Sequence, residues 1–262
     1  QLEGFKYVSY LEQRSDELKQ ADEKVEGYGN ALKEFVAVNK NDGSITYRLR
    51  SYLGAASGFD NFIAYVNSST RILLTENEAW AYKSLILQKE ALEYQSKTLD
   101  QQKTGLGYSQ NSMRQQIDTM NNTKLSEEAY INKATQEGIN VSVKSTLQQQ
   151  IFLADDQKNT TLNIKSNNLK QITAINNQIT MYIDKKTQYL SQMKAYLTVY
   201  YTALDEQKKL KRQLPVNFLT DGKIFKGFNE FGQLVAVYDM YNNSIIIEYE
   251  SYFLNDSSGY RI

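Results

Sequence analysis

Apolar residues recur at every seventh position along three long stretches of the chain. The first stretch covers residues 5–38, where one apolar row is Leu11, Leu18, Val25 and Leu32, and a second row is Ala21, Tyr28 and Phe35. Rows three or four residues apart lie side by side on an α-helix and form the a and d positions of a heptad repeat. The first stretch therefore predicts a helix that packs against another helix along its length.

A second helix is predicted from Thr75-Glu76-Asn77-Glu78, where Thr and Glu have the spacing of a capping box. Its apolar row is Leu85, Leu92, Leu99, Leu106, Met113 and Met120, and its companion row is polar: Gln88, Gln95, Gln102, Ser109 and Gln116. One apolar row per heptad packs weakly, so this stretch predicts a long exposed arm or a contact with other polar helices. Ser126 and Gly138 then predict a short helix over residues 127–137.

The third stretch has the longest heptad repeat and predicts a helix that starts near residue 143 and ends at Pro215. Its strongest a and d positions form a predicted helix-packing interface: Ile172, Ile175, Ile179, Tyr182, Tyr189, Met193, Tyr196 and Tyr200. Four of these eight residues are Tyr. A buried phenol must reach water or a hydrogen-bond partner, so this interface is expected to be partly wet.

Outside the heptads, residues 45–70 predict either two short helices or a short strand and a helix. Beyond Pro215 the apolar period changes to two, which predicts strands over residues 223–228, 234–238 and 244–250, with a turn at Asn242-Asn243. The expected fold is mainly α, with long antiparallel helical hairpins or a bundle and a small C-terminal antiparallel β segment. The expected domains are a helical coiled-coil or bundle module, 1–214, and a β-hairpin segment, 215–262.

Composition excludes several kinds of chemistry. The chain of 262 residues has no Cys and no His, which removes disulfides, thiolate nucleophiles and the commonest general base and metal ligand. Lys and Arg together number 30, as do Asp and Glu, so no net charge attracts nucleic acid. No apolar run approaches the ~20 residues that span a bilayer. We expect no cofactor, no metal, no nucleic-acid partner and no membrane insertion.

Paired carboxylates are candidates for acid–base chemistry, as at Glu76 with Glu78, Glu127 with Glu128, and Asp155 with Asp156. Acids near helix starts ordinarily complement the helix dipole, and no apolar cleft is implied around them. Gly105-Leu106-Gly107 follows no strand and has no Lys-Ser/Thr after it, so it is not a phosphate loop. The sequence therefore predicts a non-enzymatic protein.

The stretch Phe228-Asn229-Glu230-Phe231-Gly232-Gln233-Leu234-Val235-Ala236-Val237-Tyr238-Asp239 resembles one unit of the RHS/YD-repeat family. The unit has an aromatic-Asp pair, a turn ending in Gly, a polar residue and Leu, and a strand that closes on Asp. The structural positions of the motif are Phe228, Asn229, Gly232, Leu234 and Asp239, and Tyr249 opens the next unit. Asn229 replaces the usual Asp, and Glu250 replaces it again after Tyr249.

This resemblance implies a bacterial secreted or wall-associated protein, because members of the family build hollow β-shells from tandem hairpins and often enclose a toxin segment. The helical part would precede such a shell or lie at its mouth. The absence of Cys suits secretion or surface display. The start at Gln1, without Met, suggests a processed chain or an excerpt from a longer one.

The function expected from these patterns is that of a non-enzymatic structural or interaction module of a secreted or surface bacterial assembly. It would act through a protein partner or through self-association of its helices, as part of a larger chain or assembly. One alternative is a helical pore-forming toxin, whose nearest candidate for membrane entry is the short stretch 53–66. Another alternative is a component of a phage tail or injection machine, in which the helices tie subunits together.

Overall fold

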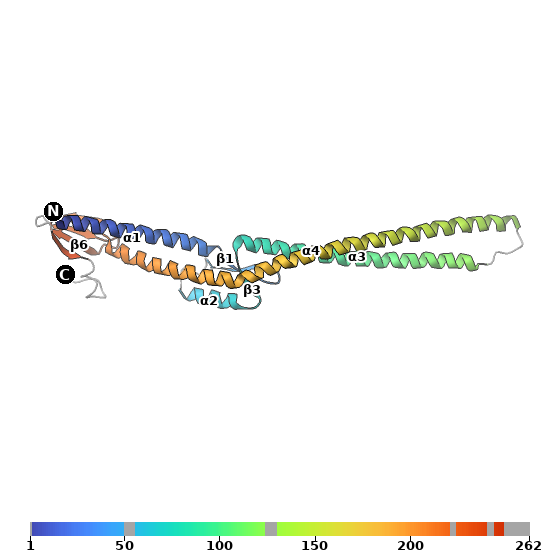
Figure 1. The fold of residues 1–262 in the computed structure, drawn as a ribbon, viewed down its shortest axis with the longest axis horizontal. Coiled ribbons are helices and arrows are strands. Elements are labelled where there is room, and N and C mark those ends of the chain that lie inside the picture. The colour runs from blue at the N-terminus through green and yellow to red at the C-terminus, as the bar shows by residue number, and fades with distance from the viewer. Residues whose placement is uncertain (1, 50–55, 124–129, 221–223, 240–243, 249–262) are drawn as a thin grey trace. The chain divides into compact units, whose positions relative to one another are not determined.

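The computed structural model describes residues 2–49, 56–123, 130–220, 224–239 and 244–248, which are mainly helical (Figure 1). The helices are α1 (Leu2–Lys33), α2 (Ala56–Asn67), α3 (Glu76–Asn122) and α4 (Tyr130–Gln213). Two small antiparallel sheets accompany them. The predicted fold class, long helices with a small C-terminal antiparallel β segment, is confirmed.

The chain forms two compact units. Unit 1 contains residues 1–40, 44–76 and 185–262, and unit 2 contains residues 41–43 and 77–184. The long helix α4 contributes its first part to unit 2 and its last part to unit 1. Each unit is described by itself below.

A three-stranded sheet lies in unit 1 and consists of β1 (Phe35–Asn39), β2 (Ile45–Arg48) and β3 (Arg71–Thr75). Its order is β2-β1-β3, all antiparallel, with Ala37 opposite both Tyr47 and Leu73. The first predicted helix is therefore wrong at its end: α1 stops at Lys33, and the heptad position Phe35 belongs to a strand. A short run of apolar residues before a turn suits a buried strand as well as a helix.

Residues 45–70 take the second of their two predicted forms, a strand followed by a helix, as β2 and α2. The turn before β2 requires glycine at residue 43, whose φ is 69°. In unit 2, a Cβ on Gly43 would lie 2.8 Å from the Cα of Lys83. The heptad pattern did not predict β3.

The core of unit 1 is built from the end of α1, the three-stranded sheet, α2 and the last part of α4. Its buried members are Leu32, Phe35, Ala37, Leu49, Phe59, Phe62, Val66, Leu73, Met193 and Leu197. Ring contacts extend this core: Tyr189 meets Phe35 edge to face at 5.7 Å between ring centroids, and Tyr201 meets Phe59 in the same way at 5.5 Å. Such pairs add about 0.5–1.5 kcal/mol each beyond the area they bury.

The second sheet, also in unit 1, is a four-stranded meander in the order β4-β5-β6-β7. Its strands are β4 (Asn217–Thr220), β5 (Ile224–Phe228), β6 (Leu234–Asp239) and β7 (Ser244–Glu248). Three strands agree with the prediction, and β4 was missed because four residues beside Pro215 have too short an alternation to identify. The predicted turn at Asn242-Asn243 lies outside the described residues.

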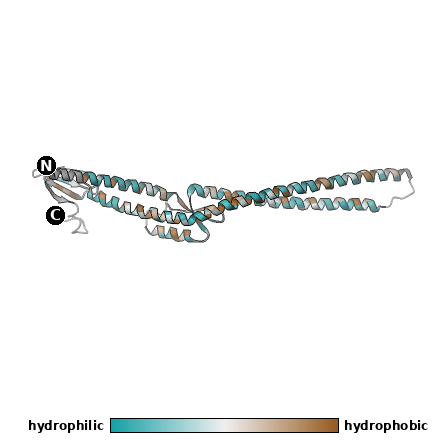
Figure 2. Ribbon diagram, viewed as in Figure 1, coloured by the Kyte–Doolittle hydropathy of each residue, from teal (hydrophilic) through white to brown (hydrophobic). Residues whose placement is uncertain are grey.

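Unit 2 is an antiparallel pair formed by α3 and the first part of α4, with polar and apolar residues mixed along both helices (Figure 2). The prediction of a separate short helix over residues 127–137 is wrong, since α4 begins at Tyr130 and continues through Gly138. A glycine inside a helix costs about 1 kcal/mol relative to Ala, which is too little to stop a helix supported on both sides.

Candidate interaction site

The structure divides the eight predicted helix-packing residues of α4 between the two units. In unit 2, Ile175 is buried, Ile172 and Ile179 are half-buried, and the ring of Tyr182 meets that of Tyr82 edge to face at 6.0 Å. In unit 1, Met193 is fully buried, Tyr189 packs on Phe35, and Tyr196 and Tyr200 lie toward α1. These residues therefore belong to two separate packing surfaces.

Lys186 places a positive charge within this heptad row, and its ammonium group binds two backbone carbonyls. Its Nζ donates hydrogen bonds to the backbone carbonyls of Ser68 and Arg71, both at 2.9 Å. These carbonyls flank the turn between α2 and β3, so Lys186 ties that turn to α4. Burial, together with the positive charge of Lys40, lowers the pKa of Lys186 below its ordinary value.

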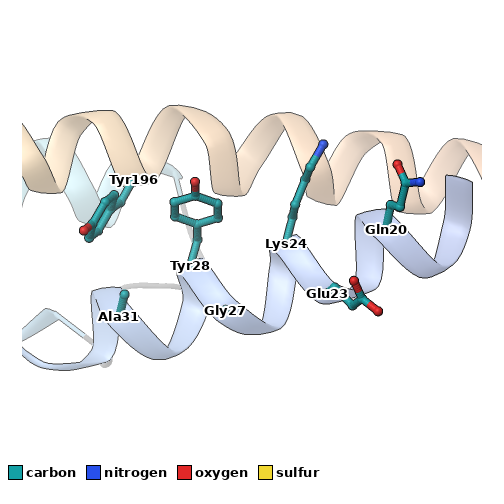
Figure 3. Close-up of a pocket in the computed structure, with 7 residues that line it drawn as sticks. All are labelled: Gln20, Glu23, Lys24, Gly27, Tyr28, Ala31 and Tyr196. Carbon is teal, nitrogen blue, oxygen red and sulfur yellow. The ribbon is translucent and has the colours of Figure 1, made fainter.

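A shallow groove lies between α1 and α4 in unit 1, with a volume of about 410 Å³ (Figure 3). Its lining comes from one face of α1 and from one residue of α4: Gln20, Glu23, Lys24, Gly27, Tyr28, Ala31 and Tyr196. The α1 residues share a face because they recur at intervals of three or four positions. We call this feature the α1–α4 groove.

Two tyrosines form the aromatic end of the α1–α4 groove. Tyr28 stands from α1 toward α4, and Tyr196 extends from α4 beside it, with the ring centroids 5.4 Å apart and the planes at 63° (Figure 3). Nε2 of Gln192 donates a hydrogen bond of 2.6 Å to the hydroxyl of Tyr196. This end of the groove therefore presents two apolar ring faces, with the polar hydroxyl of Tyr196 beside them.

Two glycines of α1 have different roles near these rings. A Cβ on Gly29 would lie 3.2 Å from Cε2 of Tyr200, so the absent side chain permits a close approach of the two helices. A Cβ on Gly27 would meet no atom within 4 Å, so Gly27 leaves space open in the α1–α4 groove. Gly27 is thus the position where a larger side chain would fill the groove.

The groove offers an amide, a carboxylate, an ammonium group and two aromatic rings, which together suit a polypeptide with both polar and apolar side chains. The heptads predicted Tyr28 and Tyr196 as packing residues, but not Gln20, Glu23, Lys24 or Gly27, which occupy ordinary polar positions of a helix. Within the described ranges, no three or more His, Cys, Asp or Glu residues are grouped so that they could hold a metal ion.

Polar side chains are buried in the contact between α3 and α4 in unit 2. Gln110 is 1% exposed, and its Nε2 donates to the carbonyl of Ile151 at 2.9 Å and to Oδ1 of Asp155 at 2.7 Å. Nζ of Lys158 donates a hydrogen bond to Oε1 of Gln110. Gln110 therefore has its amide donors and its carbonyl oxygen engaged by α4.

Two further polar contacts repeat this arrangement along unit 2. Nδ2 of the buried Asn168 donates to Oε1 of Gln95 at 2.9 Å and lies 3.4 Å from Oγ of Ser96. Nζ of Lys165 contacts both carboxylate oxygens of Asp100, at 2.7 and 2.6 Å. A shift of one helix along the other would break all three contacts together, so they specify a single register.

The predicted polar companion row of α3 forms only part of this contact. Gln88 and Gln102 are exposed, whereas the buried α3 residues that face α4 include Tyr82, Ser96 and Gln110. These lie on the other side of the predicted Leu row. The prediction of weak packing missed them because Ser and Gln look like surface residues in a sequence, although buried amides can pair across helices.

The motif residues of the YD-like stretch lie at the turn between β5 and β6. Phe228 ends β5 opposite Leu234, which begins β6, and Gly232 has a φ of 75°, which favours glycine. Asp239 ends β6 opposite Ile224. Tyr249 lies outside the described residues.

Asn229 is the centre of this turn and is 0% exposed. Its Oδ1 accepts hydrogen bonds from the backbone N–H groups of Phe231 and Gln233, at 3.0 and 2.8 Å. Its Nδ2 donates to Oε1 of Gln233 and to the backbone carbonyl of Arg212, both at 2.9 Å. Arg212 is in the last turn of α4, so this one amide joins the second sheet to the end of the helix.

In the part of the chain that the structure describes, no helix is both long and apolar enough to cross a membrane. Comparison with protein-family models, curated proteins and solved structures finds no match to this chain. The resemblance to the RHS/YD-repeat family stays a prediction from the residues that carry it.

Proposed function

We propose that this chain is a non-enzymatic interaction module of a secreted or surface-displayed bacterial assembly. Unit 1 holds a polypeptide partner in the α1–α4 groove, and the helix pair of unit 2 serves as a spacer of fixed register. The observation that carries the proposal is the use of buried polar side chains in unit 2. Gln110, Asn168 and their partners lock two helices together, which is a structural role.

The α1–α4 groove supports the same reading. It is open and shallow, and its charges have opposite signs, since Glu23 and Lys24 are neighbours on its rim. An enclosed apolar pocket with a few converging polar groups is the usual form of a small-molecule site. A groove of mixed polarity beside two aromatic rings resembles instead a protein interface, where Tyr is enriched and the rim is polar.

The experiment is chemical cross-linking of intact producing cells, followed by detection of this chain in wall-associated and extracellular fractions. The variant Gly27→Leu fills the groove, and Leu favours helix over Gly by up to ~1 kcal/mol, so the fold should persist. Gly138→Leu is the matched control, because a Cβ there also meets no atom within 4 Å. Circular dichroism of both purified variants checks that the helices remain.

We expect the unmodified chain and Gly138→Leu to give the same cross-linked complex with a second protein, and Gly27→Leu to lose most of it. Full cross-linking of Gly27→Leu would show that the groove holds no partner. Recovery of the unmodified chain only from the cytosol would contradict the assembly role. Dye release from liposomes at nanomolar protein would favour the pore-forming alternative.

A further inference from the structure

The helix α3 has a second apolar stripe that does not face α4. Its members recur at seven-residue intervals and are well exposed: Trp80 (56%), Leu87 (54%), Tyr94 (74%) and Tyr108 (72%). Gln101 occupies the remaining position of the row. Isolated exposed apolar residues are ordinary on a protein surface, but a heptad row of three aromatic residues and a leucine is a helix-pairing pattern.

This stripe lies on the opposite side of α3 from the contact with α4. Tyr82 and Gln110, which are buried against α4, each follow a member of the exposed row by two residues. Two residues correspond to about 200° around a helix. The stripe and the internal contact therefore occupy opposite faces, and the pairing of α3 with α4 leaves the stripe uncovered.

Small residues complete the exposed face. Four positions after each member of the row come Ser84, Ala91, Thr98, Gly105 and Ser112. The face thus alternates a large side chain with a small one, as d and a positions of a heptad. On a face of this kind, the large residues of one helix can occupy the space beside the small residues of a second helix that presents the same pattern.

A second copy of α3 running antiparallel supplies this complement. With the twofold axis between residues 92 and 93, Tyr94 packs beside Ala91 of the second copy, and Ala91 packs beside its Tyr94. The same register places Leu87 beside Thr98 and Trp80 beside Gly105. In this register Trp80, Leu87 and Tyr94 each meet a small residue, and Tyr108 lies opposite Asn77, whereas parallel pairing would stack large on large and small on small.

The charges beside the stripe fit the same register. Glu90 and Lys97 are exposed and precede two of the small positions by one residue, which places them at g positions. In the antiparallel pair, Glu90 of each copy lies opposite Lys97 of the other. Charge and size complementarity therefore agree on one alignment.

The area available is consistent with a stable dimer. A fully buried aromatic side chain removes about 150–250 Å² from water, so the rings of Trp80 and Tyr94 together with Leu87 offer on the order of 400 Å² per copy. Contacts from the flanking residues raise the total over both copies to the lower end of the ~1,200–2,000 Å² typical of specific interfaces.

We propose that two copies of this chain pair antiparallel through the outer face of α3, with Trp80, Leu87 and Tyr94 as anchors. In the resulting assembly the four helices of two α3–α4 pairs lie in the order α4-α3-α3-α4, because the stripe and the contact with α4 occupy opposite faces of α3. This pairing goes beyond the proposed function and does not depend on it, because it uses neither the α1–α4 groove nor a partner protein. Either can fail while the other holds.

Sedimentation velocity of the whole chain over a concentration series tests the pairing. We expect a dimer for the unmodified chain and a monomer for the double variant Leu87→Ser/Tyr94→Ser. Phe152→Ser is the matched control, since Phe152 is an equally exposed aromatic residue of unit 2, at 72%, on α4 instead of α3. It should remain dimeric. Circular dichroism confirms that each variant keeps its helices.

A charge exchange tests the register without disturbing the apolar face. Lys97→Glu places two acids opposite each other twice per dimer and should weaken the dimer on the order of tenfold. The double variant Glu90→Lys/Lys97→Glu should restore the original dissociation constant. The proposal is overturned by a monomer at every concentration, by a dimer that tolerates Leu87→Ser/Tyr94→Ser, or by a double charge variant as weak as Lys97→Glu.

Discussion

The side chain of Asn229 joins the second sheet to the end of α4, and a single substitution can test how much this contact stabilises the protein. Aspartate has the same shape as asparagine but no side-chain N–H, so Asn229→Asp removes the two donated hydrogen bonds and keeps the two accepted ones. Aspartate is also the residue that the RHS/YD pattern carries at this place. The substitution therefore asks whether this turn depends on the amide.

The expected loss of stability follows from the two oxygen atoms to which Nδ2 of Asn229 donates hydrogen bonds. The amide of Gln233 can turn to donate to the new carboxylate, which recovers one contact. The carbonyl of Arg212 cannot turn, and it would face a carboxylate oxygen at a site that is 0% exposed and at the negative end of the helix dipole. Loss of a net hydrogen bond and desolvation of an unpaired buried acceptor give about 2–4 kcal/mol of destabilisation.

Urea unfolding at pH 7 measures this loss, and hydrogen exchange of β5 and β6 shows where it occurs. Asn111→Asp is the matched control, because Asn111 is exposed on α3 and the same exchange there should change stability by less than about 0.5 kcal/mol. We expect faster exchange in the second sheet for Asn229→Asp alone. Equal stability of Asn229→Asp and the unmodified chain would refute the idea that the donated bond to α4 holds this joint.

Four further substitutions or titrations test other contacts. Gly27→Ala should raise the free energy of unfolding by about 0.5–1 kcal/mol. Gly29→Ala should not, because the new Cβ would crowd the ring of Tyr200 on α4. Thermal melting measures both variants, and equal gains would show that α1 is not closely packed against α4 at Gly29. Tyr201→Phe should be neutral or stabilising by about 1 kcal/mol in urea unfolding, because this buried hydroxyl has no hydrogen-bond partner among the described residues, and a clear loss of stability would reveal one. Gln110→Ala should destabilise unit 2 by about 2–3 kcal/mol by leaving partner groups unpaired, and unchanged hydrogen exchange in α3 would argue against the buried contact. Burial raises the pKa of Tyr82, and burial together with Tyr200 raises the pKa of Tyr201. The free energy of unfolding is therefore full below pH ~10, the ordinary tyrosine pKa, and falls as pH rises beyond it. An ultraviolet titration in which every tyrosine ionises together near that pH, before the protein unfolds, would contradict this.

The heptads predicted the long helices well and the first sheet poorly, for one physical reason. A seven-residue repeat sustained over many turns fits only a helix, so most of α3 and α4 could be recognised from apolar spacing alone. Phe35 continued the first repeat in register, yet it is the start of β1. A short apolar run is compatible with either structure. Pairing decides here: β1 pairs with β2 across a short turn and with β3, which lies beyond α2 in the sequence.

The candidate site was predictable where it uses apolar side chains and hidden where it uses polar ones. Tyr28 and Tyr196 came from the heptads, but the groove also depends on Gly27, whose role is the absence of a side chain. Gln110 is buried despite its polarity, because α4 satisfies its amide. Asn229 was recognised as a turn residue, yet its contact with α4 joins positions 17 residues apart and is visible only in three dimensions.

A heptad repeat indicates that a helix packs against a partner helix, but it does not indicate whether that partner belongs to the same chain. On α3 the row from Leu85 to Met120 and the row from Trp80 to Tyr108 share the same period, and only the first lies beside the contact with α4. The polar contacts at Gln110 and Asn168 remove the ambiguity for the inner face, since exchanging the two faces would bury unpaired charges and expose satisfied amides. The large aromatic residues are therefore kept on the outer face by the polar layers on the inner one. It follows that weakening those layers should also weaken the proposed dimer, because an α3 free to rotate against α4 would no longer present Trp80 and Tyr94 together.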